Sequence, residues 1–149
     1  MRVVLQRVSR AQVTVESRVT GSIASGLMIL LGVGLADTAA VAGSMAEKCA
    51  NLRIFEDEQG KMNRSLLDVT GAALVVSQFT LYGDARGQRR PSFISAASPE
   101  IAKKLYEEFC DALQKLGVSV GRGIFQTMMS VELVNEGPVT ILVDSDKTF

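Results

Sequence analysis

Three hydrogen-bonding side chains close the most hydrophobic strand that the sequence predicts. Residues 72–84 read AALVVSQFTLYGD, and Ser77, Gln78 and Thr80 stand where further valine or isoleucine would be expected. On an alternating strand Gln78 and Thr80 would share one face, and Ser77 and Phe79 the other. Two interpretations are open. One is a partly exposed strand end, with Thr80 present for its β propensity. The other is the floor of a site where an amide, hydroxyls and main-chain N–H groups converge.

The absence of histidine limits the chemistry available to such a site. It removes the base of every Ser-His-Asp or Cys-His arrangement. The two cysteines, Cys49 and Cys110, fall in helical patterns and are interpreted as reduced core thiols. They cannot build a usual zinc site without histidine, and no acidic spacing suggests a magnesium or calcium site. An enzyme with this sequence would have to use hydroxyls, amides, main-chain groups, lysine, carboxylates or the substrate itself.

Two glycine-containing motifs have an ordinary structural interpretation beside a functional one. LGVGLAD at 31–37 imitates a dinucleotide fingerprint, but Asp37 stands at the third glycine position, where its carboxylate would repel a pyrophosphate. We therefore expect a tight strand-to-helix turn there. Gly137-Pro138, taken alone, predicts a hairpin turn between two strands. The same dipeptide is also the common route to a cis peptide bond.

The loop at 83–93, GDARGQRRPSF, is rich in glycine and arginine. Its guanidinium groups could hold phosphates, although a solvated loop is the commoner explanation of such a segment. Its position directly after the polar strand end adds support to phosphate binding, and both interpretations stay open. The candidate phosphate contacts are Arg86, Arg89 and Arg90.

Length and composition predict an ordinary globular protein. The 149 residues, 47% apolar and 21% charged, are enough for one domain, residues 1–149, with its own core. Sixteen basic residues balance sixteen acidic ones, so nucleic acid or membrane could be attracted only by a local patch. The N-terminus lacks a signal-peptide pattern and no apolar stretch is long enough to cross a bilayer. We expect a cytoplasmic protein without membrane contact.

The apolar pattern predicts eight or nine strands and two helices. One helix follows Asp37 as N-cap, and the other begins at Ser98-Pro99, where the serine hydroxyl would cap it, and ends at Gly117. The fold class is α/β (α+β): a curled mixed or antiparallel sheet, barrel-like, with both helices outside. The expected strands are 3–8 and 11–15 as a hairpin joined by Ser9-Arg10, 27–34, 53–55, 72–81, 118–120, 128–134 and 139–143. Residues 19–23 could form a further short strand, and 62–69 are the segment that returns after a turn at 56–61.

Two separated motifs give the sequence a family resemblance. SQFTLYGD at 77–84 with NEGPVT at 135–140 resembles the signature pair of the D-aminoacyl-tRNA deacylases. Flanking segments from MRVVLQRVSRAQVTV to GIFQTMMSVELVNEGPVT are similar to the same family along nearly the whole chain. The resemblance implies a homodimer that hydrolyses the ester joining a D-amino acid, or glycine, to the 3′-terminal adenosine of tRNA. It implies no metal and no organic cofactor.

The resemblance also implies roles for individual residues. The terminal adenosine and the scissile ester would lie against Ser77, Gln78, Phe79 and Thr80. A cis-bonded Gly137-Pro138 would reach into the partner's site with its carbonyl oxygens and reject L-amino acids, with Arg7 holding that segment. The pocket wall would include Phe125 and Met129.

Two positions depart from the family pattern, and the role of Thr80 needs a choice. Gln126-Thr127 stands where Gly-Ala is usual and could narrow the pocket, while Glu136 replaces aspartate, a milder change. Without a histidine base the Thr80 hydroxyl is a weak nucleophile. We expect it to position water or substrate, assisted by the 2′-hydroxyl of the tRNA.

Two alternative functions remain open from the sequence. The first is a non-catalytic RNA-binding module that uses the arginine loop. The second is a related deacylase that edits an L-amino acid, for which a trans bond before Pro138 would be expected.

Overall fold

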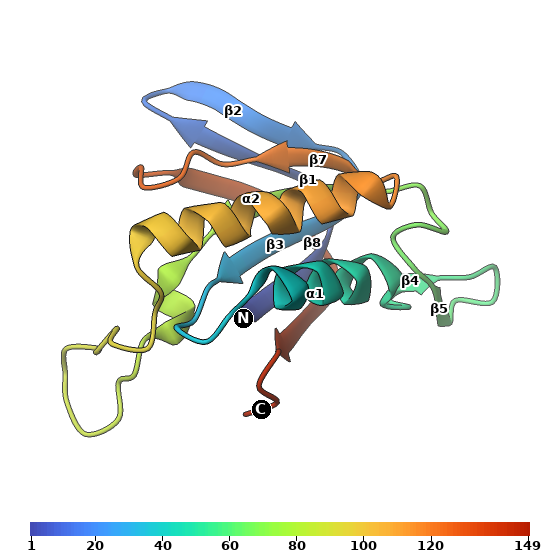
Figure 1. The fold of residues 1–149 in the computed structure, drawn as a ribbon. Coiled ribbons are helices and arrows are strands. Elements are labelled where there is room, and N and C mark those ends of the chain that lie inside the picture. Colours follow the sequence, from blue (N-terminus) through green and yellow to red (C-terminus); the bar gives the residue numbers. More distant parts are fainter.

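One long strand organises the sheet of this computed structural model, which describes residues 1–149. The strand β1 pairs antiparallel with β3 over its first half, with β2 over its second half, and with β8 along nearly its whole length. β6 continues the sheet parallel to β3, and β7 lies parallel to β6 (Figure 1). The six strands of this mixed sheet are β1 (Arg2–Val15), β2 (Arg18–Ile23), β3 (Gly26–Gly32), β6 (Ala72–Ser77), β7 (Ser119–Arg122) and β8 (Ser130–Asp144).

The sheet curls until its outer strands approach each other. A Cβ on Gly21 of β2 would lie 2.7 Å from the main-chain oxygen of Arg122 in β7, although no hydrogen-bond ladder joins the two strands. The result is a nearly closed, barrel-like mixed sheet, as the sequence predicts. A separate two-stranded ribbon, β4 (Phe55–Glu56) with β5 (Met62–Arg64), projects from it.

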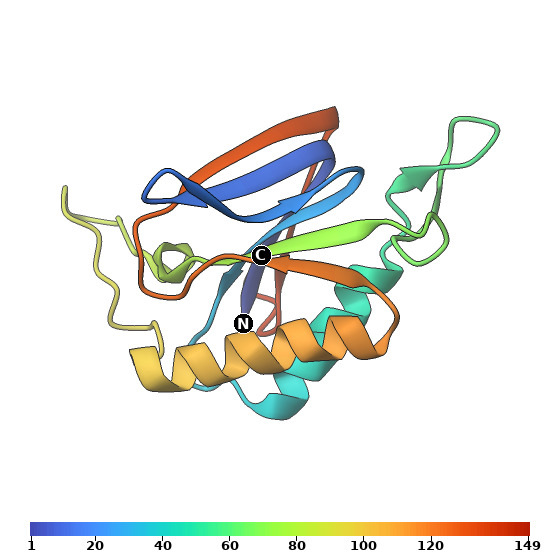
Figure 2. The same cartoon turned by 90° about the horizontal axis from the view of Figure 1, so that it is seen from above.

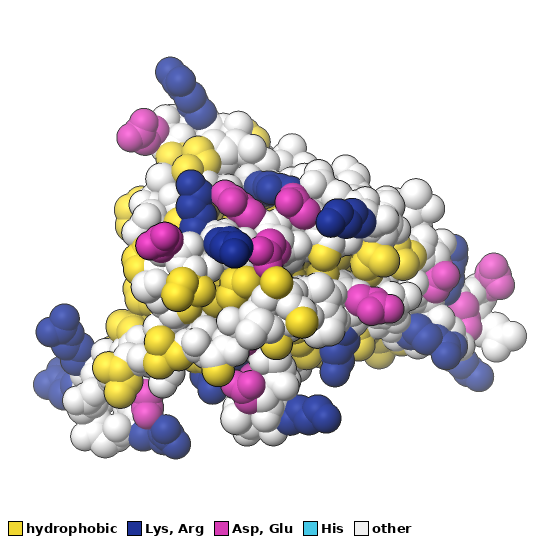
Figure 3. Space-filling view, viewed as in Figure 1, with side chains coloured by type: hydrophobic (Ala, Val, Ile, Leu, Met, Phe, Trp, Pro, Cys, Tyr) yellow, Lys and Arg dark blue, Asp and Glu magenta, His cyan; other side chains and the backbone are white.

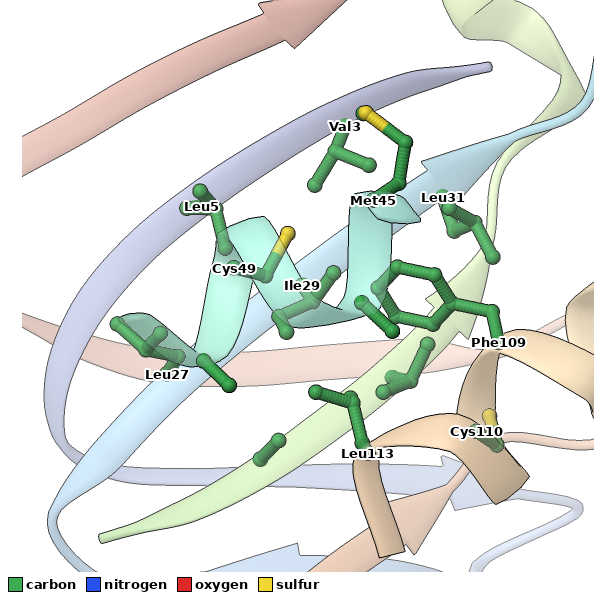
Figure 4. Close-up of a cluster of buried hydrophobic side chains, with 14 of the residues drawn as sticks. Val3, Leu5, Leu27, Ile29, Leu31, Met45, Cys49, Phe109, Cys110 and Leu113 are labelled. Atoms are coloured by element: carbon green, nitrogen blue, oxygen red, sulfur yellow. The ribbon is translucent and has the colours of Figure 1, made fainter. Parts of the chain in front are cut away.

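Both helices cover the same face of the sheet. Figure 2 shows α1 (Ala39–Asn51) and α2 (Pro99–Lys115) packed together below it. The main core lies between them and the sheet, and Figure 4 shows side chains of β1, β3, α1 and α2 meeting there. A second, smaller cluster fills the inside of the curl. Leu27, Ile29 and Leu31 of β3 face the helices and Met28 faces the curl, so β3 is buried on both faces, as its continuous apolar run predicts.

Two predicted hairpins are wrong. β1 continues through Ser9-Arg10, and the turn comes at Glu16-Ser17, whose φ values of 47° and 65° suit a two-residue hairpin loop. The polar pair Ser9-Arg10 suggested a turn, but in the structure it lies at a register shift between β1 and β8 within the continuous strand. Likewise β8 is one strand: residues 136–139 bulge out of it opposite Arg7 instead of turning the chain back.

The predicted helix caps also need correction. Thr38, not Asp37, caps α1, because its hydroxyl accepts the Val41 N–H at 3.3 Å. The Asp37 carboxylate is occupied by the Gly34 N–H at 2.6 Å and by the Met1 ammonium. Ser98 is the N-cap of α2, but its hydroxyl makes no capping hydrogen bond. Helical spacing predicts an apolar stripe along α2, and only its outermost positions, 101 and 116, are exposed. The stripe consists of Ile101, Leu105, Phe109, Ala112, Leu113 and Leu116.

Tyr82 explains why the turn after β3 is tight. A Cβ on Gly34 would lie 2.5 Å from the Tyr82 hydroxyl oxygen and 2.6 Å from the ring carbon that bears it. A Cβ on Gly32 would lie 3.0 Å from the Leu81 Cβ. The glycines of the LGVGLAD segment therefore make room for residues 81–82, which supports the expectation of a packing turn.

We predict that Gly34→Ala destabilises the fold by about 1–3 kcal/mol, because the new methyl group overlaps a rigid ring that is itself buried. Gly43→Ala is the matched control. Gly43 lies within α1 with nothing within 4 Å of an added Cβ, so alanine should stabilise by about 0.5–1 kcal/mol. Urea unfolding of both variants measures the two effects. Equal stability of Gly34→Ala and the wild type would contradict this packing.

Candidate active site

The polar end of β6 is a turn and not a continuation of the strand. Ser77 is the last residue paired with β3, and Gln78 N–H donates the final bond of that ladder to Leu31 O at 2.8 Å. β3 ends at Gly32, so no partner strand remains, and residues Phe79–Tyr82 form a short 3₁₀ helix, η1. The prediction of a strand to residue 81 is therefore wrong, as is the alternation of faces. Instead the Gln78 amide donates to the Thr80 hydroxyl.

The first residues of η1 keep their main-chain N–H groups free. The hydrogen bonds of the turn begin with Leu81 N–H to Gln78 O at 3.2 Å and continue with Gly83 N–H to Thr80 O at 2.9 Å. The N–H groups of Phe79 and Thr80 precede the first donor, as at the start of any helix. Phe79 and Thr80 are exposed residues, and their two unpaired N–H groups are the candidates to donate to a ligand.

A mostly apolar cavity of about 720 Å³ opens beside this turn. Its volume falls in the range of small-molecule sites, about 300–1,000 Å³. It lies between the ends of β3 and β6, the start of α2 and the segment 125–129. Its lining is Leu31, Val33, Val76, Ser77, Gln78, Phe79, Phe93, Ala96, Ala97, Pro99, Ala102, Tyr106, Phe125, Gln126, Thr127, Met128, Met129 and Val131.

The structure places five of the predicted site residues on this cavity. They are Ser77, Gln78, Phe79, Phe125 and Met129. Thr80 is exposed beside it and is tied to the lining through Gln78. Gln126 and Thr127 also line the cavity. Gln126 has a positive φ of 59°, a conformation that glycine adopts more readily, and the Thr127 hydroxyl closes the turn on Ile124 O at 2.9 Å.

Aromatic side chains that the sequence reasoning did not select form two of the walls. The rings of Phe79 and Phe93 meet edge to face with centroids 5.0 Å apart. Tyr106 donates its hydroxyl to Val75 O at 2.9 Å and packs 6.2 Å from Phe125. Burial raises the pKa of Tyr106, so it is a fixed hydrogen-bond donor and not a base. Its place next to Leu105, in the apolar stripe of α2, was the only signal in the sequence.

The Gly137-Pro138 segment lies elsewhere in the chain. The peptide bond between the two residues is cis, and both are exposed at the bulge of β8. Asn135 closes the base of the bulge: its side chain accepts the Val139 N–H at 3.1 Å and donates to the Thr140 hydroxyl at 3.0 Å. Neither Gly137 nor Pro138 lines the cavity.

The buried Arg7 guanidinium holds this bulge. It donates to Glu136 O at 3.1 Å and to Ile54 O at 2.8 Å, and it approaches the Glu56 carboxylate at 3.5 Å. Arg7 pairs with Leu27 on β3, four residues before the Leu31 that pairs with Ser77. Four strand residues span about 13 Å. The bulge and the cavity of the same chain are therefore separated along the sheet.

The arginine loop contains one neutralised and two free guanidinium groups. Arg86 donates twice to the Asp84 carboxylate, at 2.9 and 2.7 Å, and so holds the pKa of Asp84 well below its usual value. Arg89 and Arg90 are exposed and form no ion pair. In Figure 3 the basic side chains of this loop project at the lower left. An antiparallel bridge between Asp84 and Ser92 joins the two ends of the loop, next to Phe93 of the cavity lining.

Other chemistry-bearing groups are inert here. Cys49 and Cys110 are free and buried, and burial raises their pKa values to about 12 and about 11, so both are protonated core thiols as expected. No three His, Cys, Asp or Glu side chains gather as a metal-binding group. Neither α-helix has the length and apolar character needed to cross a membrane.

Comparison with known proteins gives a consistent result. Residues 4–144 match the family described as D-Tyr-tRNA(Tyr) deacylase. A D-aminoacyl-tRNA deacylase of Roseiflexus castenholzii is 64% identical over 97% of this chain and 92% of its own. One from Koribacter versatilis is 60% identical over the full length of both chains.

Two solved structures are similar in fold. One, described as a c-Myc DNA Unwinding Element Binding Protein, has a TM-score of 0.91 at 39% identity and covers 97% of this chain and 99% of its own. The other, a probable eukaryotic D-amino acid tRNA deacylase, has a TM-score of 0.81 over 95% of this chain and 97% of its own. At 18% identity, this second likeness concerns the fold alone.

Proposed function

Because the chain belongs to the D-Tyr-tRNA(Tyr) deacylase family, we propose that it hydrolyses the ester between a D-amino acid and the 3′-terminal adenosine of tRNA. It is a hydrolase of the aminoacyl-tRNA ester bond. The observation that carries the proposal is the η1 turn, whose free N–H groups stand at the mouth of a cavity lined by aromatic and aliphatic side chains. We place the reaction in the cytoplasm, where aminoacyl-tRNA is used.

The cavity would take the terminal adenosine. Its walls offer the rings of Phe79, Phe93 and Phe125, and stacking on such rings is a common way to hold a splayed-out RNA base. The Gln78 amide and the Ser77 hydroxyl lie at the polar end of the lining, where the ribose and the ester would follow. Gln126 would narrow the entrance relative to a glycine at the same position.

The ester carbonyl would lie against the start of η1. Main-chain N–H groups aimed at a developing oxyanion are among the strongest contributions to ester hydrolysis, since removing one donor typically costs about 10²–10³ in rate. The N–H groups of Phe79 and Thr80 are such a pair. The Thr80 hydroxyl has no base beside it and is held by Gln78, so it would orient water or substrate instead of attacking. The 2′-hydroxyl of the tRNA would assist.

Gly137-Pro138 of a second copy would discriminate between D- and L-aminoacyl-tRNA. The bulge is exposed and firmly anchored by the buried Arg7, and in its own chain it lies away from the cavity. A homodimer would bring it to the partner's η1, where its carbonyl oxygens would accept the D-arrangement around the α-carbon and clash with the L-arrangement. Glycine has no side chain to exclude, so glycyl-tRNA would also be hydrolysed.

The surface around the bulge supports such a dimer. β8 pairs only with β1 and leaves its other edge free. Val134 and Leu142 on the two sides of the bulge expose 40% and 57% of their surface. An exposed strand edge with apolar side chains is a common template for pairing with another chain.

A second candidate function is nucleic-acid binding without hydrolysis. One similar structure is described as a DNA Unwinding Element Binding Protein, and the arginine loop offers two free cations. A pure binder would release no amino acid from either D- or L-aminoacyl-tRNA, which the first experiment below measures.

We predict that the protein releases D-tyrosine from tRNA at least about 10²-fold faster than L-tyrosine. Gly137→Ala should lower D-tyrosine release by about tenfold or more, because a displaced Gly137-Pro138 bulge would disturb the geometry of the bound substrate. Gly137 has a φ of 128°, and its Cβ would lie 3.1 Å from an Arg7 nitrogen and 2.8 Å from Val139 Cγ2. Glu136→Ala is the matched control, because Arg7 binds only the main-chain oxygen of Glu136. Absent or equal release of both enantiomers would exclude a chiral deacylase.

We predict that Thr80→Ala retains measurable activity, with a loss of about 10- to 100-fold typical of a displaced positioning group. A tRNA ending in 2′-deoxyadenosine should be hydrolysed poorly by the wild type. Single-turnover release with both substrates measures these effects, and Thr80→Ser, which keeps the hydroxyl that Gln78 contacts, serves as control. Complete loss in Thr80→Ala, together with an acyl-enzyme accumulating in the wild type, would instead make Thr80 the nucleophile.

Arg89 and Arg90 would contact phosphates of the acceptor strand beside the cavity. We predict that replacing both with alanine flattens the plot of log affinity against log salt by about 0.7 for each phosphate that the loop no longer neutralises. Arg86→Ala, which removes a guanidinium already bound by Asp84, should change the slope much less. Fluorescence titration of tRNA at several salt concentrations measures this. Unchanged slopes in the double variant would show that the loop is only solvated.

A further inference from the structure

Arg2, at the start of β1, contacts the C-terminal end of η1, residues 81–82, which does not line the cavity. Its Nη1 donates to Leu81 O at 3.0 Å, and its guanidinium carbon lies 4.6 Å from the centre of the Tyr82 ring. Its Nε lies 3.4 Å from Oδ2 of Asp144, the last residue of β8. One side chain thus joins η1 to the strand that carries the Gly137-Pro138 bulge.

The partners of Arg2 are themselves fixed. The Asp144 side chain is fully buried and also accepts the Asp146 N–H at 3.0 Å and the Thr148 hydroxyl. Burial alone would raise the pKa of Asp144, but these hydrogen bonds and the charge of Arg2 bring it below its usual value, so the carboxylate is charged. Tyr82 is 6% exposed and packs against Gly34. The guanidinium therefore connects two rigid groups.

η1 needs such external support. It has four residues, and a helix of one turn has little stability of its own. Its position depends on the groups that hold Leu81 and Tyr82. These are Gly32 and Gly34 on one side and Arg2 on another. Phe79 and Thr80, two residues earlier in the same turn, carry the free N–H groups. A shift at Leu81 would consequently move the donors that face the ester.

We propose that Arg2 is a positioning residue for deacylation, which sets the direction of the Phe79 and Thr80 N–H groups without touching the substrate. The inference rests on the proposed function of η1. Arginine suits this task because one planar guanidinium donates to a carbonyl and pairs with a carboxylate while its face stacks on an aromatic ring. Lysine offers a single point charge and cannot make the three contacts together.

The test is steady-state hydrolysis of D-tyrosyl-tRNA by Arg2→Met, which keeps an apolar stem beside Tyr82 but removes the guanidinium. We expect kcat to fall about 10- to 100-fold, the usual cost of misplacing catalytic groups by about 1 Å. KM should stay within about twofold, because the lining of the cavity is unchanged. Arg2→Lys should fold and show an intermediate kcat, since its cation can remain over the Tyr82 ring.

Arg53→Met is the matched control. The Arg53 guanidinium likewise donates to a main-chain oxygen, that of Asn63 at 2.7 Å, and to the Asn63 side chain at 2.9 Å. It lies beside the β4–β5 ribbon and has no contact with η1. Both kinetic constants should match the wild type in this variant. Thermal unfolding of each variant sets an assay temperature at which all are folded.

The outcomes separate this inference from the proposed function. Wild-type protein that releases no D-tyrosine refutes the proposed function whatever Arg2 does. Active wild type with an unchanged kcat in Arg2→Met overturns the role of Arg2, and so does a loss that appears in KM alone. If Arg2→Met does not fold, Arg2→Lys decides: a kcat equal to that of the wild type overturns the proposal, and a reduced kcat at constant KM supports it.

Discussion

The site depends on where β6 loses its hydrogen-bonding partner. β3 ends at Gly32, so the ladder stops at Ser77 and Gln78, and the chain must satisfy its main-chain groups in another way. A single 3₁₀ turn is the local solution, and its first N–H groups are left without acceptors. The polar residues after the apolar strand are therefore neither a frayed edge nor the alternating faces of a longer strand. They are the start of a helix turn that presents donors at the mouth of a cavity.

Two arginines of β1 hold the pieces of the site: Arg2 is the first residue of the strand, and Arg7 lies near its middle. Arg7 fixes the Gly137-Pro138 bulge through Glu136 O, and Arg2 fixes η1 through Leu81 O. Both use a guanidinium to bind a main-chain carbonyl whose own ladder has been interrupted. A charged donor to such a carbonyl contributes more than a neutral one. Because β1 pairs with both β3 and β8, a single strand sets the distance between the two pieces.

The separation between the Gly137-Pro138 bulge and η1 is the reason for proposing a dimer. The bulge and the cavity of one chain lie apart, so a bulge that discriminates the configuration at the α-carbon would have to come from another copy. Exclusion by main-chain carbonyls would use atoms that every residue possesses. Discrimination would then rest on where the bulge is held, and the chemistry on where η1 is held, which is consistent with a chain that contains no histidine.

The sequence by itself determined the elements with strong periodicity and the identity of the chemical groups. The continuous run of β3 and the apolar stripe of α2 were predicted correctly, because burial on a face is set by local periodicity. The missing histidine limits which chemical groups are present, and residue type is likewise a local property. Only the tertiary structure decided that β1 and β8 are unbroken, that Thr38 caps α1, and that Thr80 sits on a turn. Each of these depends on a partner distant in the chain: β8 opposite Ser9, Met1 on Asp37, the end of β3 beside Ser77. The walls supplied by Phe93 and Tyr106 were missed for the same reason, since a cavity exists only where separate segments meet.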